Sequence, residues 1–178
     1  MQVEELTQEN LDDVACFLRD LSELDRTFIK EDLSEATVAS WAAEDQRGRR
    51  WVGTAEGGTV LGIVAVLPLA GWSSHVGDLR LVVHPAKRGQ GVGNVLAKHA
   101  LQQAVRRGLE KVIVEVVATQ QSAIGMFTGL GFDIEAILCD HIRDRQGRLQ
   151  DVVILAHSVA EQYSAMAAAG LDADLPLP

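Results

Sequence analysis

Aromatic residues are scarce in this sequence, at 4% of 178 residues. A platform that stacks nucleic-acid bases on aromatic rings is therefore not expected. Basic residues are also outnumbered, which gives a net charge of −9 and a sequence pI near 4.9. This balance excludes a generally basic nucleic-acid binder but still allows a local site for an anion. We expect no nucleic-acid partner.

Cysteines and long hydrophobic runs are nearly absent. Cys16 and Cys139 are the two cysteines, and two cysteines do not make a disulfide framework. Neither has a second Cys or a His at metal-ligand spacing, so we expect no metal and predict both as small core residues. The longest apolar stretch, Val60–Ala70, is far short of the roughly 20 residues of a membrane span. The first ten residues lack the basic and apolar regions of a signal peptide. We expect a cytoplasmic protein without a membrane partner.

The rest of the composition fits one compact domain. Hydrophobic residues make up 47% of the chain, which is enough to form a core at this length. Residues 160–178 are rich in alanine and end in Leu-Pro-Leu-Pro. We therefore expect a single domain over residues 1–159 and a C-terminal tail over 160–178.

Hydrophobic periodicity predicts strands and helices in a mixed order. The expected elements are a strand near 3–6, helices over about 11–22 and from 34, strands at 51–54, 60–67 and 79–84, a long helix ending near 107, a strand at 112–117, a helix over about 120–130, and strands at 134–142 and 149–157. Two strand-to-helix crossovers within an otherwise antiparallel run predict an α/β fold with a mixed sheet and helices packed on it.

The most informative segment is the turn between the strand that ends at Pro85 and the long helix. Three glycines alternate there, at Gly89, Gly91 and Gly93. Glycine allows positive φ and a close approach of the backbone to a ligand. The first N–H groups of the helix, together with its dipole, favour an anion such as a pyrophosphate. Residues 79–109 also hold six basic and no acidic residues, which agrees with an anion site. The alternative explanation of this charge is a basic helix face that only aids solubility.

Two common nucleotide motifs do not fit this turn. A dinucleotide fingerprint needs G-x-G-x-x-G and an acidic residue about 20 residues further on. The spacing here is G-x-G-x-G, and no acidic residue ends a second strand at that distance. The P-loop pattern G-x-x-x-x-G-K-[ST] is absent as well. A nucleotide-binding domain of either kind is therefore not expected.

The turn instead has the spacing Arg88-x-x-Gly91-x-Gly93, which follows the lead-in LVVHP at 81–85. In this spacing and lead-in it resembles the acyl-CoA signature of the GNAT N-acyltransferase superfamily. The resemblance continues downstream with Ala-Ile at 123–124, a Phe at 127 and Leu-Gly-Phe at 130–132. The similar region spans roughly residues 60–157.

This resemblance implies a central, mostly antiparallel sheet in which a parallel pair of strands splays apart, with flanking helices. Acetyl-CoA, as co-substrate, would lie in the gap. Main-chain groups of residues 81–83 would pair with its pantetheine arm, and N–H groups of residues 88–93 would hold its pyrophosphate. The cofactor-binding residues implied are Leu81, Val82, Val83, Arg88, Gly89, Gln90, Gly91, Val92, Gly93, Gln120 and Phe127.

Two of these positions depart from the family pattern. Gln120 and Phe127 stand where the family usually has Asn and Tyr. The usual Tyr often protonates the leaving CoA thiolate, and Phe127 has no hydroxyl with which to do so. A lost general acid costs ~10²–10⁴-fold in rate if nothing replaces it, although a thiolate with a pKa near ~8.5 is a tolerable leaving group. The departure keeps a second hypothesis open, namely a non-catalytic acyl-CoA sensor or a partner-binding GNAT-like domain.

The family reaction is direct attack of an amine on the thioester, which needs a base to remove a proton. Asp78, at the start of the 79–84 strand, is our first candidate. Glu115 is the second, because it is the single charge in the strand at 112–117 and alternation places it opposite its valine neighbours. The alternatives are a solvated Asp at a strand end and a structural Glu paired with Arg. His75 and His84 are weaker candidates.

The N-terminal third bears on the acceptor. Residues 1–35 hold eleven acidic and three basic residues. If the helices of this segment border the acceptor entrance, as in GNAT folds, their field attracts a cationic amine. Lysine, a polyamine or a basic antibiotic would then be favoured, with plain solvated helix faces as the alternative. The sequence leaves a homodimer open.

Overall fold

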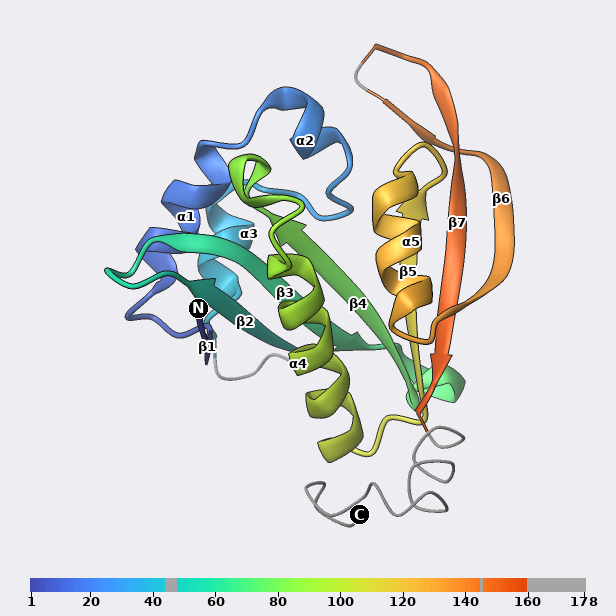
Figure 1. The fold of residues 1–178 in the computed structure, drawn as a ribbon, viewed down its shortest axis with the longest axis horizontal. Coiled ribbons are helices and arrows are strands. Elements are labelled where there is room, and N and C mark those ends of the chain that lie inside the picture. The colour runs from blue at the N-terminus through green and yellow to red at the C-terminus, as the bar shows by residue number, and fades with distance from the viewer. Residues whose placement is uncertain (44–47, 145, 160–178) are drawn as a thin grey trace.

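The computed structural model describes residues 1–43, 48–144 and 146–159. These residues form one seven-stranded sheet in the order β1-β2-β3-β4-β5-β7-β6, with helices packed on it (Figure 1). The predicted α/β mixed sheet is confirmed. The tail predicted at 160–178 lies outside the described residues.

The elements alternate much as the periodicity indicates. They are β1 (Gln2–Glu5), α1 (Leu11–Arg19), α2 (Glu23–Thr27), α3 (Glu35–Ser40), β2 (Arg49–Thr54), β3 (Val60–Pro68), η1 (Gly71–Ser73), β4 (Val76–Val83), η2 (Pro85–Lys87), α4 (Val92–Arg106), β5 (Lys111–Val117), α5 (Gln121–Gly129), β6 (Asp133–Arg143) and β7 (Leu149–Ser158). The helix predicted over 11–22 ends at Arg19, because Ser22 starts a new helix by accepting a hydrogen bond from the N–H of Asp25. The short helix α2 and the two 3-10 turns η1 and η2 were not predicted from the sequence.

The parallel pair β4 and β5 is short. It includes three residue pairs, from Val76 with Lys111 to Asp78 with Ile113. Beyond Asp78, β4 continues to pair with β3 as far as Val83, while β5 pairs with β7 along its whole length. The two strands therefore separate after these three residue pairs, as the family resemblance implies. Figure 1 shows β4 and β5 diverging.

Each face of the sheet is covered by its own hydrophobic core. Neighbouring residues of β2 show the division, because Trp51 packs in one cluster and Val52 in the other. Leu96 of α4 lies in the first cluster, and Phe17 of α1 lies in the second. Figure 1 shows α4 crossing one face of the sheet while α1 and α3 lie behind the other. The gap between β4 and β5 is thus flanked by helices on both sides.

Two sequence predictions are wrong at the level of the fold. Cys16 and Cys139 are both exposed rather than in the core. Cys16 lies off the buried stripe of α1, and Cys139 lies on β6, the last strand in the sheet order. The fourth strand also begins earlier than predicted, so Asp78 is its third residue and is buried. No helix in the described ranges is long and apolar enough to cross a membrane.

Candidate active site

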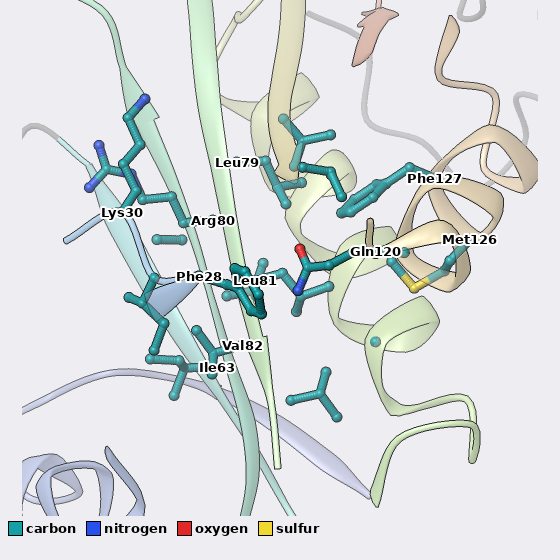
Figure 2. Close-up of a pocket in the computed structure, with 18 of the residues that line it drawn as sticks. Phe28, Lys30, Ile63, Leu79, Arg80, Leu81, Val82, Gln120, Met126 and Phe127 are labelled. Atoms are coloured by element: carbon teal, nitrogen blue, oxygen red, sulfur yellow. The ribbon is translucent and has the colours of Figure 1, made fainter. Parts of the chain in front are cut away.

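A cavity of about 600 Å³ lies where β4 and β5 separate. One wall includes residues 24–25 of α2 and residues 28–31 of the loop after it, and the opposite wall comes from the N-terminal end of α4 and from α5. In Figure 2, Lys30 and Arg80 lie on one side of the cavity and Gln120, Met126 and Phe127 on the other. A cavity of this size is large enough for a small-molecule ligand.

The glycine turn forms one end of this cavity, and its glycines serve two purposes. Gly89 and Gly91 adopt φ of +72° and +83°, and a Cβ built on either would meet nothing within 4 Å. Their conformation, not their size, requires glycine. Gly93 differs, because a Cβ there would lie 3.0 Å from Sδ of Met126 and 3.4 Å from Cγ2 of Val83. Glycine at 93 therefore lets α4 pack closely against α5 and β4.

The backbone of the same turn has N–H groups that can bind an anion. Gly91 is the N-cap of α4, without a side-chain cap. In the part of the chain that the structure describes, the N–H groups of residues 89–94 donate no hydrogen bond to another group. The first N–H groups of a helix carry its positive dipole end and have no intrahelical acceptor. Gly89, Gly91, Gly93 and Asn94 line the cavity, so this end of it can accept negative charge.

Two residues predicted in the turn contribute no side chain to the cavity lining. The side-chain amide of Gln90 donates to the carbonyl of Ala86 at 3.0 Å. Val92, the first residue of α4, is 8% exposed and packs in the hydrophobic core. Any role of these two residues at the cavity must come from the backbone.

The middle of the cavity is bordered by β4 and by the start of α5. Leu81, Val82 and Val83 are half-buried and line the cavity along the part of β4 that has left β5. An extended strand with one free edge can pair with another extended chain. Gln120 occupies the N-cap position of α5, and Figure 2 shows its side chain reaching toward Leu81. Phe127 is 3% exposed and packs edge-on against Phe132, so it contributes an apolar surface.

The two carboxylates predicted as bases meet at a single ammonium group. Nζ of Lys30 donates to Oε1 of Glu115 at 2.8 Å and to Oδ2 of Asp78 at 3.3 Å. Asp78 is 3% exposed, so the alternative of a solvated strand-end Asp is wrong. Glu115 pairs with Lys30 rather than with an arginine, and its valine neighbours face the core as alternation predicts.

Asp78 also forms an ion pair with a second cation. Nε and Nη2 of Arg80 donate to the same Oδ2, at 3.1 and 3.0 Å. Arg80 also pairs with Glu31 at 3.0 Å, and Glu31 accepts two hydrogen bonds from Arg50, at 2.6 and 3.0 Å. The resulting cluster alternates three carboxylates with three cations, which balances its charge in a partly buried place.

Lys30 is held as a cation in this cluster. Burial lowers the pKa of Lys30, but the hydrogen bonds and charges of Glu115 and Asp78 outweigh burial and raise the pKa above its usual value. Lys30 was not predicted as a site residue, because it lies in a loop, 48 residues from Asp78 and 85 from Glu115. No local pattern marks such a contact.

The N-terminal segment also reaches the glycine turn. Nη2 of Arg88 lies 2.6 Å from Oδ1 of Asp25, at the edge of the cavity. Burial raises the pKa of Asp25, but hydrogen bonds from Ser22 and Arg88 and the charge of Arg88 outweigh burial and lower it. Asp25 and Glu31 thus border the cavity as members of the acid-rich segment, and each is paired with arginine.

The histidine candidates lie elsewhere. Nδ1 of His84 accepts the N–H of Ala86 at 3.2 Å, which shapes the turn after β4. His75 is exposed just before β4. Neither lines the cavity.

Comparison with known proteins agrees with the geometry of this site. Residues 16–132 match the model of the acetyltransferase (GNAT) family. The chain therefore belongs to the GNAT family.

Individual proteins are similar to this chain in sequence, and solved structures are similar to it in fold. N-acetyltransferase 8F1 of Rattus norvegicus is 34% identical over 109 residues, which cover 60% of this chain and 48% of that protein. The chain thus spans about half the length of such a relative. The ribosomal-protein-alanine N-acetyltransferase structure from Brucella melitensis superposes with a TM-score of 0.77 at 19% identity, covering 89% of this chain and 99% of that one. A chimera of the spermidine N-acetyltransferase SpeG from Vibrio cholerae and hSSAT gives a TM-score of 0.75 at 18% identity, covering 92% and 99%.

Proposed function

We propose that this chain transfers an acetyl group from acetyl-CoA to a primary amine, by direct attack in a ternary complex. One observation carries the proposal: a single cavity connects the glycine turn, the free edge of β4 and the two carboxylates. An anion site, a strand edge and a base are what the pyrophosphate, the pantetheine arm and the attacking amine require, in that order.

The residues for acetyl-CoA are those of the turn and of β4. Of the N–H groups expected to hold the pyrophosphate, that of Arg88 donates instead to the carbonyl of Pro85 at 3.3 Å. The N–H groups of residues 89–94 therefore hold the pyrophosphate with the side chain of Arg88, and Gln90 and Val92 take part through their backbone. Residues 81–83 pair with the pantetheine amides, as another strand would. Gln120 and Phe127 border the cavity across from β4, so Gln120 offers an amide to the arm and Phe127 an apolar wall.

Glu115 is better placed than Asp78 to act as the base. Both of the cations near Asp78 donate to one of its oxygens, whereas Glu115 accepts from Lys30 alone in the described part of the chain. A base must also lie within hydrogen-bond reach of the amine. The side chain of Glu115 is also more accessible, at 25% exposed against 4% for Asp78. Glu115 therefore takes the proton of the amine, and Asp78 with Arg80 holds the charge arrangement around it.

The acceptor is a cationic primary amine. Two carboxylates converge on an ammonium at the end of the cavity opposite the turn, which is the chemistry that recognises a protonated amine. The similar structures described above are named for the amines of spermidine and of a ribosomal-protein alanine. A polyamine and the N-terminus or a lysine of a protein are the classes to test first.

A second function has one observation in its favour. Phe127 is buried against Phe132 and offers no hydroxyl to the departing thiolate. A chain that binds acyl-CoA without turning it over, as a sensor or a partner-binding domain, would need no such group.

One experiment separates the two functions. Acetyl-CoA binding is measured by calorimetry and by the rise in Tm, and the release of CoA thiol is measured with spermidine, an alanine-ended peptide, a lysine peptide and an aminoglycoside. Binding with thiol release above background supports the transferase. Saturable binding with no release from any amine supports the sensor. Absence of binding overturns both.

A further inference from the structure

The side chain that reaches the proposed base in this structure is itself a primary amine. Of the chain's four lysines, all within the described residues, Lys30 lines the cavity, whereas Lys87, Lys98 and Lys111 do not. Its Nζ lies 2.8 Å from Glu115. We infer that Lys30 is an acceptor within the same chain, so that the protein acetylates its own Lys30 when acetyl-CoA is bound. This inference rests on the proposed function.

The position of Lys30 meets the requirements for an acceptor. A carboxylate lies within hydrogen-bond distance of the nitrogen, which is the reach a general base needs. The amine lies at the point where β4 and β5 part, in the same cavity as the strand edge and the glycine turn. An amine held beside the reacting group by its own chain reacts with a high effective concentration.

The loop around Lys30 is fixed, whereas the side chain retains room to move. Its neighbour Glu31 is held by Arg50 and Arg80, and the Arg50 guanidinium lies 4.2 Å from the ring centre of Trp41. The backbone at Lys30 is thereby attached to β2 and β4. The Lys30 side chain is 47% exposed, so its nitrogen can leave the two carboxylates for the thioester without unfolding the loop.

The chemical step balances with the groups present and with acetyl-CoA. Because Glu115 and Asp78 raise the pKa of Lys30, the ammonium must first give one proton to Glu115. The neutral Nζ then attacks the thioester carbonyl. The N–C bond forms, the C–S bond breaks, and the CoA sulfur leaves with the electron pair and takes up a proton. The products are an uncharged acetyl-lysine, free CoA and one proton released to water. The cluster then holds three carboxylates and two cations, so acetylation leaves Glu115 without its ammonium.

The test uses purified protein with acetyl-CoA and no added amine, and follows each lysine by peptide mass spectrometry. Lys98, exposed on α4, reports simple chemical acetylation in the same molecule. We expect Lys30 to gain one acetyl group ~100-fold faster than Lys98, at a first-order rate that does not change on dilution of the protein. Lys30→Arg keeps the positive charge but should abolish the fast acetylation. The matched variant Lys98→Arg should still be acetylated at Lys30.

The outcomes distinguish this inference from the proposed function. Equal rates at Lys30 and Lys98, in protein that calorimetry shows to bind acetyl-CoA, overturn self-acetylation and leave the proposed function standing. A rate at Lys30 that grows with protein concentration shows transfer between molecules and overturns the intramolecular reaction. Absence of acetyl-CoA binding overturns both. A second measurement uses Glu115→Gln, whose Tm is recorded to show that the variant is folded. If Glu115 is the base, this variant must acetylate Lys30 at least ~10²-fold more slowly.

Discussion

The ammonium of Lys30 joins Glu115 to the rest of the site across the gap between the separated strands, with an Nζ–Oε1 distance of 2.8 Å. The same nitrogen reaches Asp78 on β4. Beyond Asp78 the backbones of β4 and β5 no longer pair, and the side chain of Lys30 links the two strands there. The place where the sheet opens is thus also the place where its charges are concentrated.

The two carboxylates are expected to respond differently to loss of charge. Glu115→Gln should lower amine-dependent CoA release by ~10²–10⁴-fold, the usual range for a lost general base, with little change in Tm because the side chain is partly exposed. Asp78→Asn should lower stability by ~1–3 kcal/mol, since it removes the charge of a buried carboxylate that accepts hydrogen bonds from two cations. Steady-state kinetics and thermal unfolding of both variants test the division. Equal kinetic losses would contradict it.

The glycine turn offers a matched pair of variants. Gly91→Glu places a carboxylate where the pyrophosphate should bind, so acetyl-CoA binding should be lost. Gly57, in the turn between β2 and β3, has φ of +93° and the same open space around a Cβ. Gly57→Glu therefore carries a similar backbone strain of ~1–2 kcal/mol without touching the cavity. Calorimetry should show normal acetyl-CoA affinity for Gly57→Glu. Loss of affinity in both variants would mean that strain, not the site, explains the result.

The sequence predicted the turn because its signal is local. Three alternating glycines before an amphipathic helix are typical of a turn with positive φ and exposed N–H groups, and the structure has that φ at Gly89 and Gly91. The mixed sheet and the separated strands were also predictable, from the order of elements and the family resemblance. A basic segment with glycine spacing can be found without any knowledge of the tertiary structure.

The cation cluster was not predictable for the opposite reason. Lys30 meets Glu115 across 85 residues of chain, from a loop between two short helices of which α2 was not expected. The ranking of Asp78 above Glu115 was made without the cations, because Arg80 and Lys30 converge on Asp78 only in the fold. Cys16 shows a smaller failure: a small apolar residue on a helix fits the core or the surface, and only the orientation of α1 decides.

Acid should weaken the hairpin of β6 and β7 through Asp144. Burial raises the pKa of Asp144, but hydrogen bonds from the backbone and side chain of Arg148, from Gln150 and from the backbone of Gln146 outweigh burial and lower it to about 2. The unfolded value is ~3.9, so the stabilisation is complete above that pH and is lost as the pH falls toward about 2. The Tm difference between wild type and Asp144→Asn should be constant near neutral pH and shrink below pH ~4. A difference that stays constant down to that range would contradict the assignment.

The ion pair between Arg88 and Asp25 should compete with acetyl-CoA. Arg88 belongs to the turn that we propose binds the pyrophosphate, yet its Nη2 lies 2.6 Å from Oδ1 of Asp25. The arginine side chain is 53% exposed, and a pair of this kind contributes ~0–1 kcal/mol. Asp25→Asn should therefore raise acetyl-CoA affinity by no more than ~5-fold, which is what ~1 kcal/mol allows.

A double-mutant cycle decides whether Asp25 competes for Arg88 or positions it. Arg88→Gln should weaken acetyl-CoA binding ~10-fold or more, because a charged hydrogen bond contributes ~1.5–3 kcal/mol. In that background Asp25→Asn should have no further effect, since its partner is gone and the two positions are coupled. If Asp25→Asn alone weakens binding as much as Arg88→Gln does, Asp25 orients the arginine toward the cofactor, and the ion pair is part of the binding site rather than its competitor.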